Sequence, residues 1–216
     1  MKGCFRLTLA VLLAVVVVSC QKNAEYERPL GLISRLTKLT KSAGDTPVLV
    51  YSNTDWSVSL TSKVSWAGLD RLSDYGCSQV HFCYSENFGR ARKVGIAFEA
   101  AGVRDTVFMV QAAGQTDPVL QFVSSSGEIP GAGGTMKYAL DSNLFYDIAD
   151  VVVDIRYHEE SMPGWIEVPD VTLDGVTVSA LPNGDGKERG ADIVLSHTDG
   201  EGDTISTWIT VRQSAQ

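Results

Sequence analysis

Lys93-Val94-Gly95-Ile96-Ala97-Phe98 is the stretch of sequence that indicates the fold class most clearly. Its larger apolar residues alternate with small or polar ones, which is the two-residue period of a strand with one buried face. Residues 79–84 alternate in the same way, with Val80, Phe82 and Tyr84 on one side. Residues 106–110, Thr-Val-Phe-Met-Val, are apolar on both sides and predict a strand that is covered on both faces.

Short runs of this kind continue along the chain, and clusters of Gly, Asn, Asp and Ser separate them. Helical periodicity is nearly absent beyond the first 20 residues. Each half of the chain offers about seven runs, which is typical of a β-sandwich of about 100 residues. The sequence therefore predicts an all-β protein with two tandem sandwiches. The expected strands are residues 32–36, 48–51, 56–60, 65–69, 79–84, 93–99 and 106–111, then 120–123, 135–140, 151–157, 165–168, 176–180, 191–196 and 204–212.

The first 20 residues have the order of a secretory signal peptide. Lys2 and Arg6 give a positive start, and the almost wholly apolar run of residues 7–18 follows. The alternative is a transmembrane helix, but crossing a bilayer takes about 20 apolar residues, and this run is shorter. The closing Val17-Val18-Ser19-Cys20 resembles the lipobox of a bacterial lipoprotein, in which the peptidase cuts before the cysteine and the cysteine carries the lipid.

That resemblance implies a signal peptide at residues 1–19, a lipid on Cys20 and a linker over residues 20–29. Gln21 and Lys22, followed by acidic Glu25 and Glu27, resemble the export signal that sends lipoproteins of the Bacteroidetes to the cell surface. We therefore expect a protein of the cell envelope that is anchored to the outer membrane through Cys20 and exposed at the surface.

The charge of the chain makes nucleic acid an improbable partner. It carries 18 Lys and Arg against 26 Asp and Glu, a formal net charge of −8, and no basic patch stands out. A protein that binds phosphate backbones needs clustered positive charge. The acidic residues are spread through the sequence, which is typical of a solvated surface.

Beyond the leader and the anchor Cys20, the sequence contains two cysteines, Cys77 and Cys83. If residues 79–84 form a strand, their Cα atoms lie up to about 20 Å apart, and a disulfide needs less than about 7 Å. We therefore predict two free, buried thiols. A zinc site is not expected, because there is no second cysteine pair and the only nearby histidine is His81.

The two halves of the sequence repeat several residues in the same order, with loops of different length. This order predicts a tandem duplication, with sandwiches at residues 30–114 and 118–216 and Thr116-Asp117-Pro118 as a short linker that permits some bending. The matching pairs are Asn53 with Asn143, Trp56 with Tyr146, Trp66 with Trp165, Asn87 with Asn183, Arg92 with Arg189, and Gln111 with Gln213.

These residues resemble the pattern of the BACON domain, the Bacteroidetes-Associated Carbohydrate-binding Often N-terminal module. Its pattern runs Asn-x-x-Trp, a central Trp, an Asn-x-x-x-x-Arg segment and a closing Val-x-Gln strand. The second copy has Tyr146 in place of the first Trp. The resemblance covers about residues 30–216 and implies an immunoglobulin-like β-sandwich. For the family, carbohydrate binding, mucin contact and spacer roles are all proposed.

Aromatic residues are the natural candidates for a sugar site, because sugar C–H groups pack on flat aromatic faces while polar groups bind the hydroxyls. Trp66 and Trp165 begin apolar strands, and we expect them to be core residues by analogy with other sandwiches, although Trp165 is kept as a candidate ligand-binding residue. Trp56 and Tyr146 lie near turns and are better candidates for exposure. Trp208 lies in an alternating terminal strand and is expected to be structural.

The remaining polar motifs favour structural roles. Asn87 and Asn183 are expected to stabilise turns, and Arg92 and Arg189 to open the following strands as surface or ladder partners. Residues 183–186 and 199–203 contain Asp-Gly pairs typical of hairpin turns. They do not fit the ligand spacing of an EF-hand, which leaves a weak calcium site as the minor alternative.

No cofactor and no catalytic constellation is expected. His81, His158 and His197 have no fixed relation to a nucleophile, and the Gly-x-Ser-x-Gly motif is absent from the sequence. The sequence therefore predicts a non-enzymatic, lipid-anchored protein with one of two functions. The first is binding of glycan or mucin through Trp56, Tyr146 and Trp165. The alternative is a structural spacer, or a protein-contact or adhesin subunit, in a surface assembly.

Overall fold

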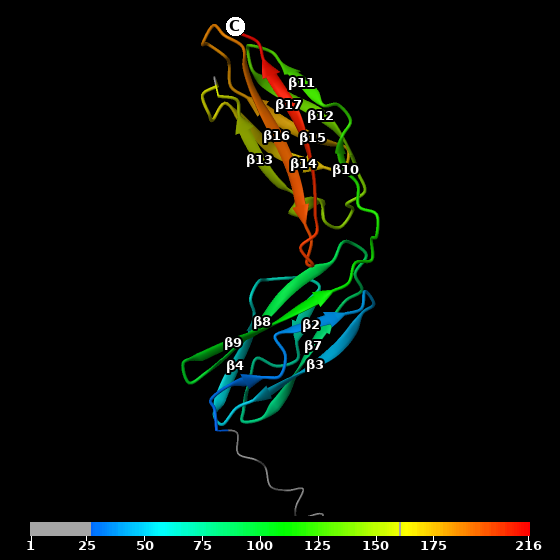
Figure 1. Cartoon of the computed structure of the whole chain (residues 1–216), viewed down its shortest axis with the longest axis vertical. Helices are drawn as coiled ribbons and strands as arrows, with labels where there is room; N and C mark the ends of the chain where they lie inside the picture. Colours follow the sequence, from blue (N-terminus) through cyan, green and yellow to red (C-terminus); the bar gives the residue numbers. More distant parts are fainter. Residues whose placement is uncertain (1–26, 160) are drawn as a thin grey trace, which may run out of the picture.

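The computed structural model describes residues 27–159 and 161–216, which form two immunoglobulin-like β-sandwiches placed end to end (Figure 1). The expected signal peptide and Cys20 lie outside the described residues. Among those residues, no helix is long and apolar enough to cross a membrane.

The first domain consists of a four-stranded sheet, β1-β3-β7-β5, packed on a five-stranded sheet, β2-β9-β8-β4-β6. Pairing is antiparallel except for β2, which runs parallel to β9. The strands are β1 (Gly31–Leu32), β2 (Leu36–Leu39), β3 (Gly44–Tyr51), β4 (Asp55–Leu60), β5 (Ala67–Leu69), β6 (Ser73–Tyr75), β7 (Ser78–Tyr84), β8 (Arg92–Ala100) and β9 (Val103–Gln111).

The second domain repeats this arrangement with the sheets β10-β12-β15-β14 and β11-β17-β16-β13. Again one pair, β11 with β17, is parallel. The elements are β10 (Leu120–Phe122), β11 (Ser126–Ile129), β12 (Gly134–Ser142), the 3-10 helix η1 (Ile148–Asp150), β13 (Val152–Tyr157), β14 (Ile166–Thr172), β15 (Gly175–Ala180), β16 (Arg189–Thr198) and β17 (Thr204–Gln213).

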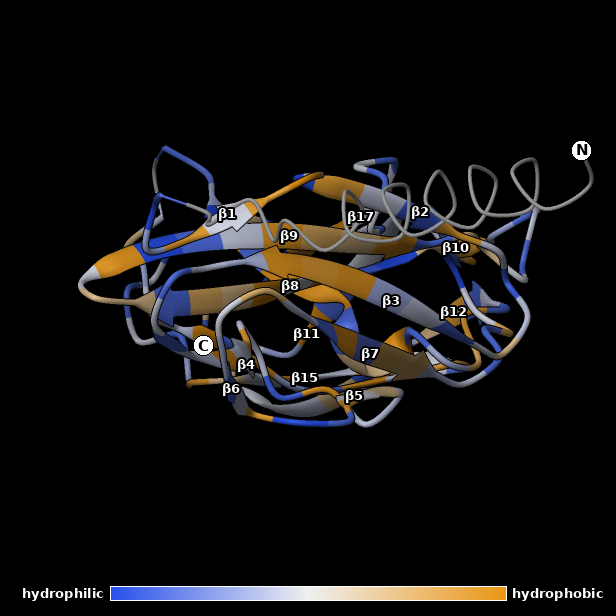
Figure 2. Cartoon of the chain, turned by 90° about the horizontal axis from the view of Figure 1, so that it is seen from below, coloured by the Kyte–Doolittle hydropathy of each residue, from blue (hydrophilic) through white to orange (hydrophobic). Residues whose placement is uncertain are grey.

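Each domain has its own core, built from the inward faces of its two sheets. In the first domain, Ile96 and Phe98 of β8 and Met109 of β9 are fully buried, as alternation along β8 predicts. Figure 2 shows the apolar residues concentrated along the central strands β8 and β9. The equivalent strands of the second domain bury Ile193, Leu195 and Ile209.

The strands differ from the predicted ones mainly at the sheet edges. Residues 32–36 were predicted as one strand, but β1 ends at Leu32 and β2 begins at Leu36, because the chain crosses there from one sheet to the other. β6 and β11 were not predicted, since Ser73–Tyr75 and Ser126–Ile129 are short and largely polar. Phe108 was expected to be covered, but it is 39% exposed, with the Lys93 Nζ 4.5 Å above its ring.

Arg90 of the first domain anchors the junction between the domains. Its side chain is 5% exposed and forms an ion pair at 3.2 Å with Asp199, whose side chain is 8% exposed. Its Nη1 donates to the His197 carbonyl and its Nη2 to the Asp203 carbonyl, each at 2.9 Å. The hairpin turn between β16 and β17 therefore rests on the first domain (Figure 1). The linker alone permits bending, but these contacts oppose it.

Candidate binding surface

The repeated Trp, Arg and Gln form the same cluster in both domains. In the first domain, the Arg92 Cζ lies 4.3 Å from the centre of the Trp66 ring, and its Nε donates to Gln111 Oε1 at 2.8 Å. The Ser85 carbonyl accepts from Arg92 Nη2 and from Gln111 Nε2, at 2.8 and 3.0 Å. Gln111 is fully buried, and Lys41 supplies a further carbonyl acceptor at 3.1 Å.

The second domain reproduces these contacts. The Arg189 Cζ lies 4.6 Å from the centre of the Trp165 ring, and its Nε donates to Gln213 Oε1 at 2.8 Å. The Leu181 carbonyl accepts from both Arg189 and Gln213, each at 2.9 Å. Gln213 is also fully buried, with the Pro130 carbonyl as a further acceptor at 3.0 Å. We call each cluster a hub.

The repeated asparagines also have structural roles. Asn87 and Asn183 are buried, and each accepts from the N–H two residues ahead while its Nδ2 bonds nearby carbonyls. The predicted turn roles are therefore confirmed. Asn53 and Asn143 each donate from Nδ2 to a carbonyl that precedes the first strand of their domain, at 3.2 and 2.9 Å. The arginines do open β8 and β16, but as stacked hub members, not as surface residues.

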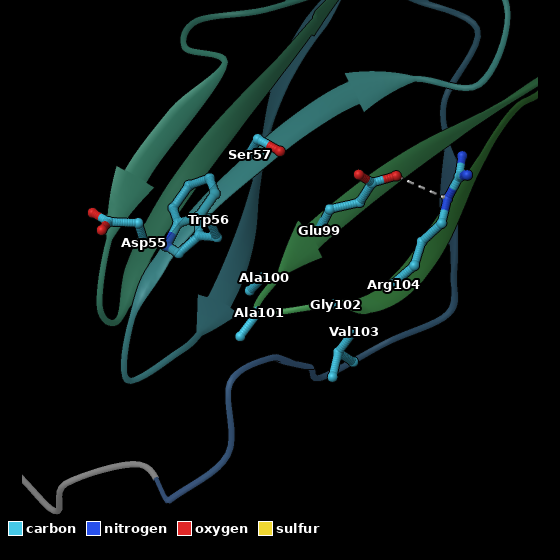
Figure 3. Close-up of a pocket in the computed structure, with 9 residues that line it drawn as sticks. All are labelled: Asp55, Trp56, Ser57, Glu99, Ala100, Ala101, Gly102, Val103 and Arg104. Carbon is cyan, nitrogen blue, oxygen red and sulfur yellow. Dashed lines mark ion pairs between the residues drawn. The ribbon is translucent and has the colours of Figure 1, made fainter.

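Trp56 is not the exposed residue that its position near a turn suggested. It is 2% exposed, packs on Phe98 with ring centres 5.9 Å apart, and donates from Nε1 to the Gly76 carbonyl at 2.9 Å. An open cavity of about 570 Å³ lies beside it. Figure 3 shows the residues that line this cavity, which include the turn of the β8–β9 hairpin. The charged pair there, Glu99 with Arg104, is exposed and 3.5 Å apart. This cavity presents no exposed aromatic face.

Trp165 is likewise buried, with 3% exposure, so its candidacy as a ligand-binding residue was wrong. Its Nε1 is buried without a hydrogen-bond partner within the described part of the chain. The expectation that it belongs to the core is confirmed. The Arg189 guanidinium lies over its ring, and the tilted ring of Tyr157 packs against it with its centre 6.1 Å away.

Tyr146 is 67% exposed, as expected, but it is not the structural counterpart of Trp56. Strand registers place Val58 opposite Phe98 and Val153 opposite Leu195, and both partners lie six residues after the hub arginine. Val58 and Val153 therefore hold equivalent positions. Trp56 lies two residues before Val58, so its counterpart is Val151, two residues before Val153. Tyr146 belongs to extra residues before β13 and packs against Phe88 of the first domain, with tilted rings whose centres are 5.8 Å apart.

The cysteines are free as predicted but exposed, which corrects the expectation of burial. Cys83 faces outward on β7, and its Sγ lies 3.5 Å from Asp45 Oδ2. Partial desolvation and this carboxylate raise the pKa of the Cys83 thiol.

The Asp199–Asp203 segment is the predicted hairpin turn, because Asp199 Oδ1 accepts from the N–H groups of residues 201, 202 and 203 at 2.9–3.0 Å. Over residues 27–159 and 161–216, no group of three or more His, Cys, Asp or Glu side chains is placed to hold a metal ion.

Trp208 of β17 is the exposed tryptophan of the second domain, with 63% exposure, so it is not a residue of the core. It forms one wall of an open groove of about 580 Å³ between β17 and the chain that leaves β10. Phe122 and Thr207 are the buried floor, where Thr207 Oγ1 accepts from the Phe122 N–H at 3.2 Å. Buried Leu120, exposed Val123 and the polar residues Gln121, Ser124, Ser125 and Ser206 complete the lining.

Polar side chains continue from Trp208 across the outer face of the sheet. Register places Trp208 beside Val194 and Val194 beside Asp154. In the next row, Asp192 Oδ1 accepts from the Thr210 hydroxyl at 2.6 Å and lies 3.3 Å from His158 Nε2. The Thr210 bond, followed by the contacts with His158, holds the pKa of Asp192 below its usual value. We call the groove, together with Val194, Asp154, Asp192, Thr210 and Arg156 on the outer face of the sheet, the Trp208 face.

The pattern around each tryptophan contained the signal that separates the buried from the exposed ones. Trp56 shares its strand face with Val58 and Leu60, which are apolar, so alternation places it inward. Trp208 shares its face with Ser206 and Thr210, which are polar, so alternation places it outward. The residues two positions away are therefore more informative than the distance from a turn.

No protein-family model matches the chain, and no curated protein matches it. Solved structures similar to it include a Bacteroides ovatus GH5 xyloglucanase in complex with a XXXG heptasaccharide (TM-score 0.37, 14% identity, 48% of this chain, 22% of that chain). Another is human protocadherin-24 EC1-2, with a TM-score of 0.33, 10% identity, and coverage of 87% of this chain and 98% of that chain. A third is a Bacteroides thetaiotaomicron protein, with a TM-score of 0.31, 15% identity, and coverage of 44% of this chain and 97% of that chain. The chain spans less than a third of the xyloglucanase.

Proposed function

We propose that this protein is a non-enzymatic glycan-binding protein of the cell envelope and that the Trp208 face is its binding surface. The single observation that carries the proposal is the exposed indole of Trp208 in a groove with polar side chains around it. A sugar ring stacks its C–H groups on the indole, since the aromatic face is apolar and flat. The hydroxyls of Ser124, Ser125 and Ser206 are then available to bind sugar hydroxyls.

The remaining tryptophans do not offer such a surface. Trp56 and Trp165 are buried, and Trp66 lies beneath the Arg92 guanidinium. The Trp208 face also suits a polar ligand, because Asp154 lies in the same cross-strand row as the indole, and Asp192 and Arg156 lie in the next row. Mucin-type and other host, plant or microbial glycans are the ligand class that this combination favours. The resemblance to the BACON pattern is compatible with such a ligand.

The proposed location is the outer membrane, with Cys20 lipidated and the domains exposed at the surface. A short segment would then separate the anchor from β1, which begins at Gly31. In Figure 1 the described chain begins at the end of the first domain that is farther from the second. The second domain, with the Trp208 face, would therefore lie away from the membrane, where large glycans are accessible.

A glycan array tests the proposal on residues 21–216, which include every described residue. We expect selective binding by the unmodified protein and at least a tenfold loss for Trp208→Ala, because stacking on an aromatic ring is lost. Tyr146→Ala is the matched control, because it removes an equally exposed aromatic elsewhere and is expected to bind normally. Absence of binding to any glycan, or equal binding by Trp208→Ala, would contradict the proposal.

A second candidate function, a rigid spacer in a surface assembly, is favoured by the Arg90 junction. The buried ion pair and the carbonyl contacts fix the domains against each other without relying on the linker. A spacer needs this rigidity but does not need an exposed tryptophan. Retained glycan binding in an Arg90→Met variant, together with loss in Trp208→Ala, would favour the binding function.

A further inference from the structure

One strand edge of the second domain lacks the neighbour that its counterpart in the first domain has. In the first domain, β6 pairs with β4 and closes the edge of the five-stranded sheet. The Val58 N–H donates to the Leu72 carbonyl at 2.8 Å. The counterpart of β4 is β13, which pairs with β16 and is the last strand of its sheet in the described part of the chain.

The unpaired backbone groups of β13 can be identified from the ladder. The His158 N–H donates to the Gly190 carbonyl at 3.1 Å, so even-numbered residues of this strand bond to β16. Because antiparallel strands alternate, the N–H and C=O groups of Val153, Ile155 and Tyr157 point to the open side. Val153 is also the counterpart of Val58, whose N–H donates to the carbonyl of Leu72, the residue just before β6. Within the part of the chain that the structure describes, three donors and three acceptors of β13 therefore form a regular, open row.

The other edge strands of the molecule are short or irregular. Among the described strands, β1, β2, β5, β6, β10 and β11 have two to four residues. β14 has seven, but it contains Pro169 and a register shift between Glu167 and Asp170. Proline and bulges are devices that protect an edge from pairing. β13 has six regular residues and neither device.

The sequence of β13 is complementary to itself. In an antiparallel pair of two β13 strands centred on Ile155, each Ile155 faces the Ile155 of the second copy, and Val153 faces Tyr157. Asp154 of each copy then faces Arg156 of the other. Asp154 and Arg156 already lie side by side on the outer face, with Arg156 Nε 2.8 Å from Asp154 Oδ2. Opposite charges directly across a strand pair are stabilising.

Hydrogen bonding gives the same register independently. The odd-numbered residues carry the open N–H and C=O groups, so Ile155 with Ile155 and Val153 with Tyr157 become hydrogen-bonded pairs. The charged residues then occupy the non-bonded pairs, where Cα atoms approach to about 4.5 Å and side chains are closest. One register therefore satisfies all the open backbone groups and both pairs of charges.

From this complementarity, we infer that a second copy of this chain pairs with β13 and forms a twofold dimer with a continuous eight-stranded sheet, β11-β17-β16-β13 in each copy. The first domain cannot dimerise in this way, because β6 covers the corresponding edge. The Trp208 faces of the two copies lie on one surface, with the tryptophans about 24 Å apart at about 4.8 Å per strand. A long glycan could then bind both, although the dimer itself requires no glycan.

Sedimentation of residues 21–216 tests the dimer without any glycan, so its outcome is separate from that of the binding function. We expect a monomer–dimer equilibrium, with weaker dimerisation by about tenfold or more in Asp154→Arg and in Arg156→Asp, because each places like charges across the interface. The double variant Asp154→Arg/Arg156→Asp restores the complementarity and the dimer. Glu128→Arg, the same charge change on the opposite edge strand β11, is the matched control and leaves dimerisation unchanged.

A disulfide trap tests the register in residues 21–216 that also carry Cys77→Ser and Cys83→Ser. The double variant Asp154→Cys/Arg156→Cys is expected to form an intermolecular disulfide, because Cα atoms about 4.5 Å apart lie within the range that a disulfide spans. Each single variant is the control and is expected to remain largely uncrosslinked. A monomer at concentrations up to about 1 mM, the range of weak association, or a disulfide in a single variant but not in the double, would overturn the inference.

Discussion

The two domains have the same hub but differ at one sheet edge and on one sheet face. Around Trp66 and around Trp165, the arginine and glutamine partners make the same contacts. In each hub, one carbonyl accepts hydrogen bonds from both the arginine and the glutamine. In contrast, β6 covers the edge in the first domain only, and Trp208 has Thr106 as its counterpart in β9. The comparison teaches that the repeated residues stabilise the sandwich. Binding sites are therefore expected at the positions where the two domains differ.

The hub glutamines should give the largest effect on stability. In Gln213→Leu, the largely covered Arg189 side chain loses the acceptor of its Nε and three carbonyls lose a donor, so we expect a loss of about 3 kcal/mol in the free energy of unfolding. Gln111→Leu is expected to destabilise the first domain by a similar amount. Urea unfolding measures both. A loss below about 1 kcal/mol in either variant would show that the hub is not the shared framework.

The junction arginine should come next. Arg90→Met removes the partner of Asp199, but that carboxylate keeps three backbone N–H donors, so we expect a loss of about 2 kcal/mol. The Gly200 N–H, which donates to the Ala91 carbonyl across the junction, should lose protection from hydrogen exchange. Arg35→Met is the control, because Arg35 is exposed and its ion pair spans 3.7 Å. Unchanged protection at Gly200 would mean that Arg90 does not hold the domains together.

The hairpin turns offer a smaller, stabilising test. Ala101 has a φ of 47°, the left-handed region that strains residues with a Cβ, while the β16–β17 turn places Gly202 at its positive φ. Ala101→Asn should stabilise the first domain by about 0.5–1 kcal/mol, since asparagine tolerates this conformation better. A thermal melt detects the change. A lower melting temperature would show that the turn favours alanine for another reason.

The smallest expected effect concerns acid. The folded pKa of Asp192 lies below its ordinary value of 3.8, so its contribution is present above that pH and is lost as the pH falls below it. At a one-third exposed carboxylate, this contribution is no more than about 1 kcal/mol. In Asp192→Asn, the difference in urea stability between pH 7 and pH 3 should therefore shrink. An unchanged difference would mean that the Thr210 bond does not stabilise the carboxylate.

Alternation in the sequence predicted most of the strands and the burial of the central ones, because a sandwich buries every second residue. It did not predict β6, since three largely polar residues at an edge are too few to show alternation. The pairing of Trp56 with Tyr146 was wrong because the extra residues before β13, including η1, break the correspondence after Asn143. The Trp208 face was missed because the groove combines β10 and β17, which are far apart in the sequence.

Collisional quenching of tryptophan fluorescence by iodide is the most direct test of the central claim. Trp208 is 63% exposed, whereas Trp56 and Trp165 are 2% and 3% exposed and Trp66 is partly buried beneath Arg92. Most of the quenching should therefore come from Trp208 and disappear in Trp208→Phe. Mucin glycans, or the glycans selected on the array, should protect this fraction from iodide. Quenching that is unchanged by bound glycan would contradict the account.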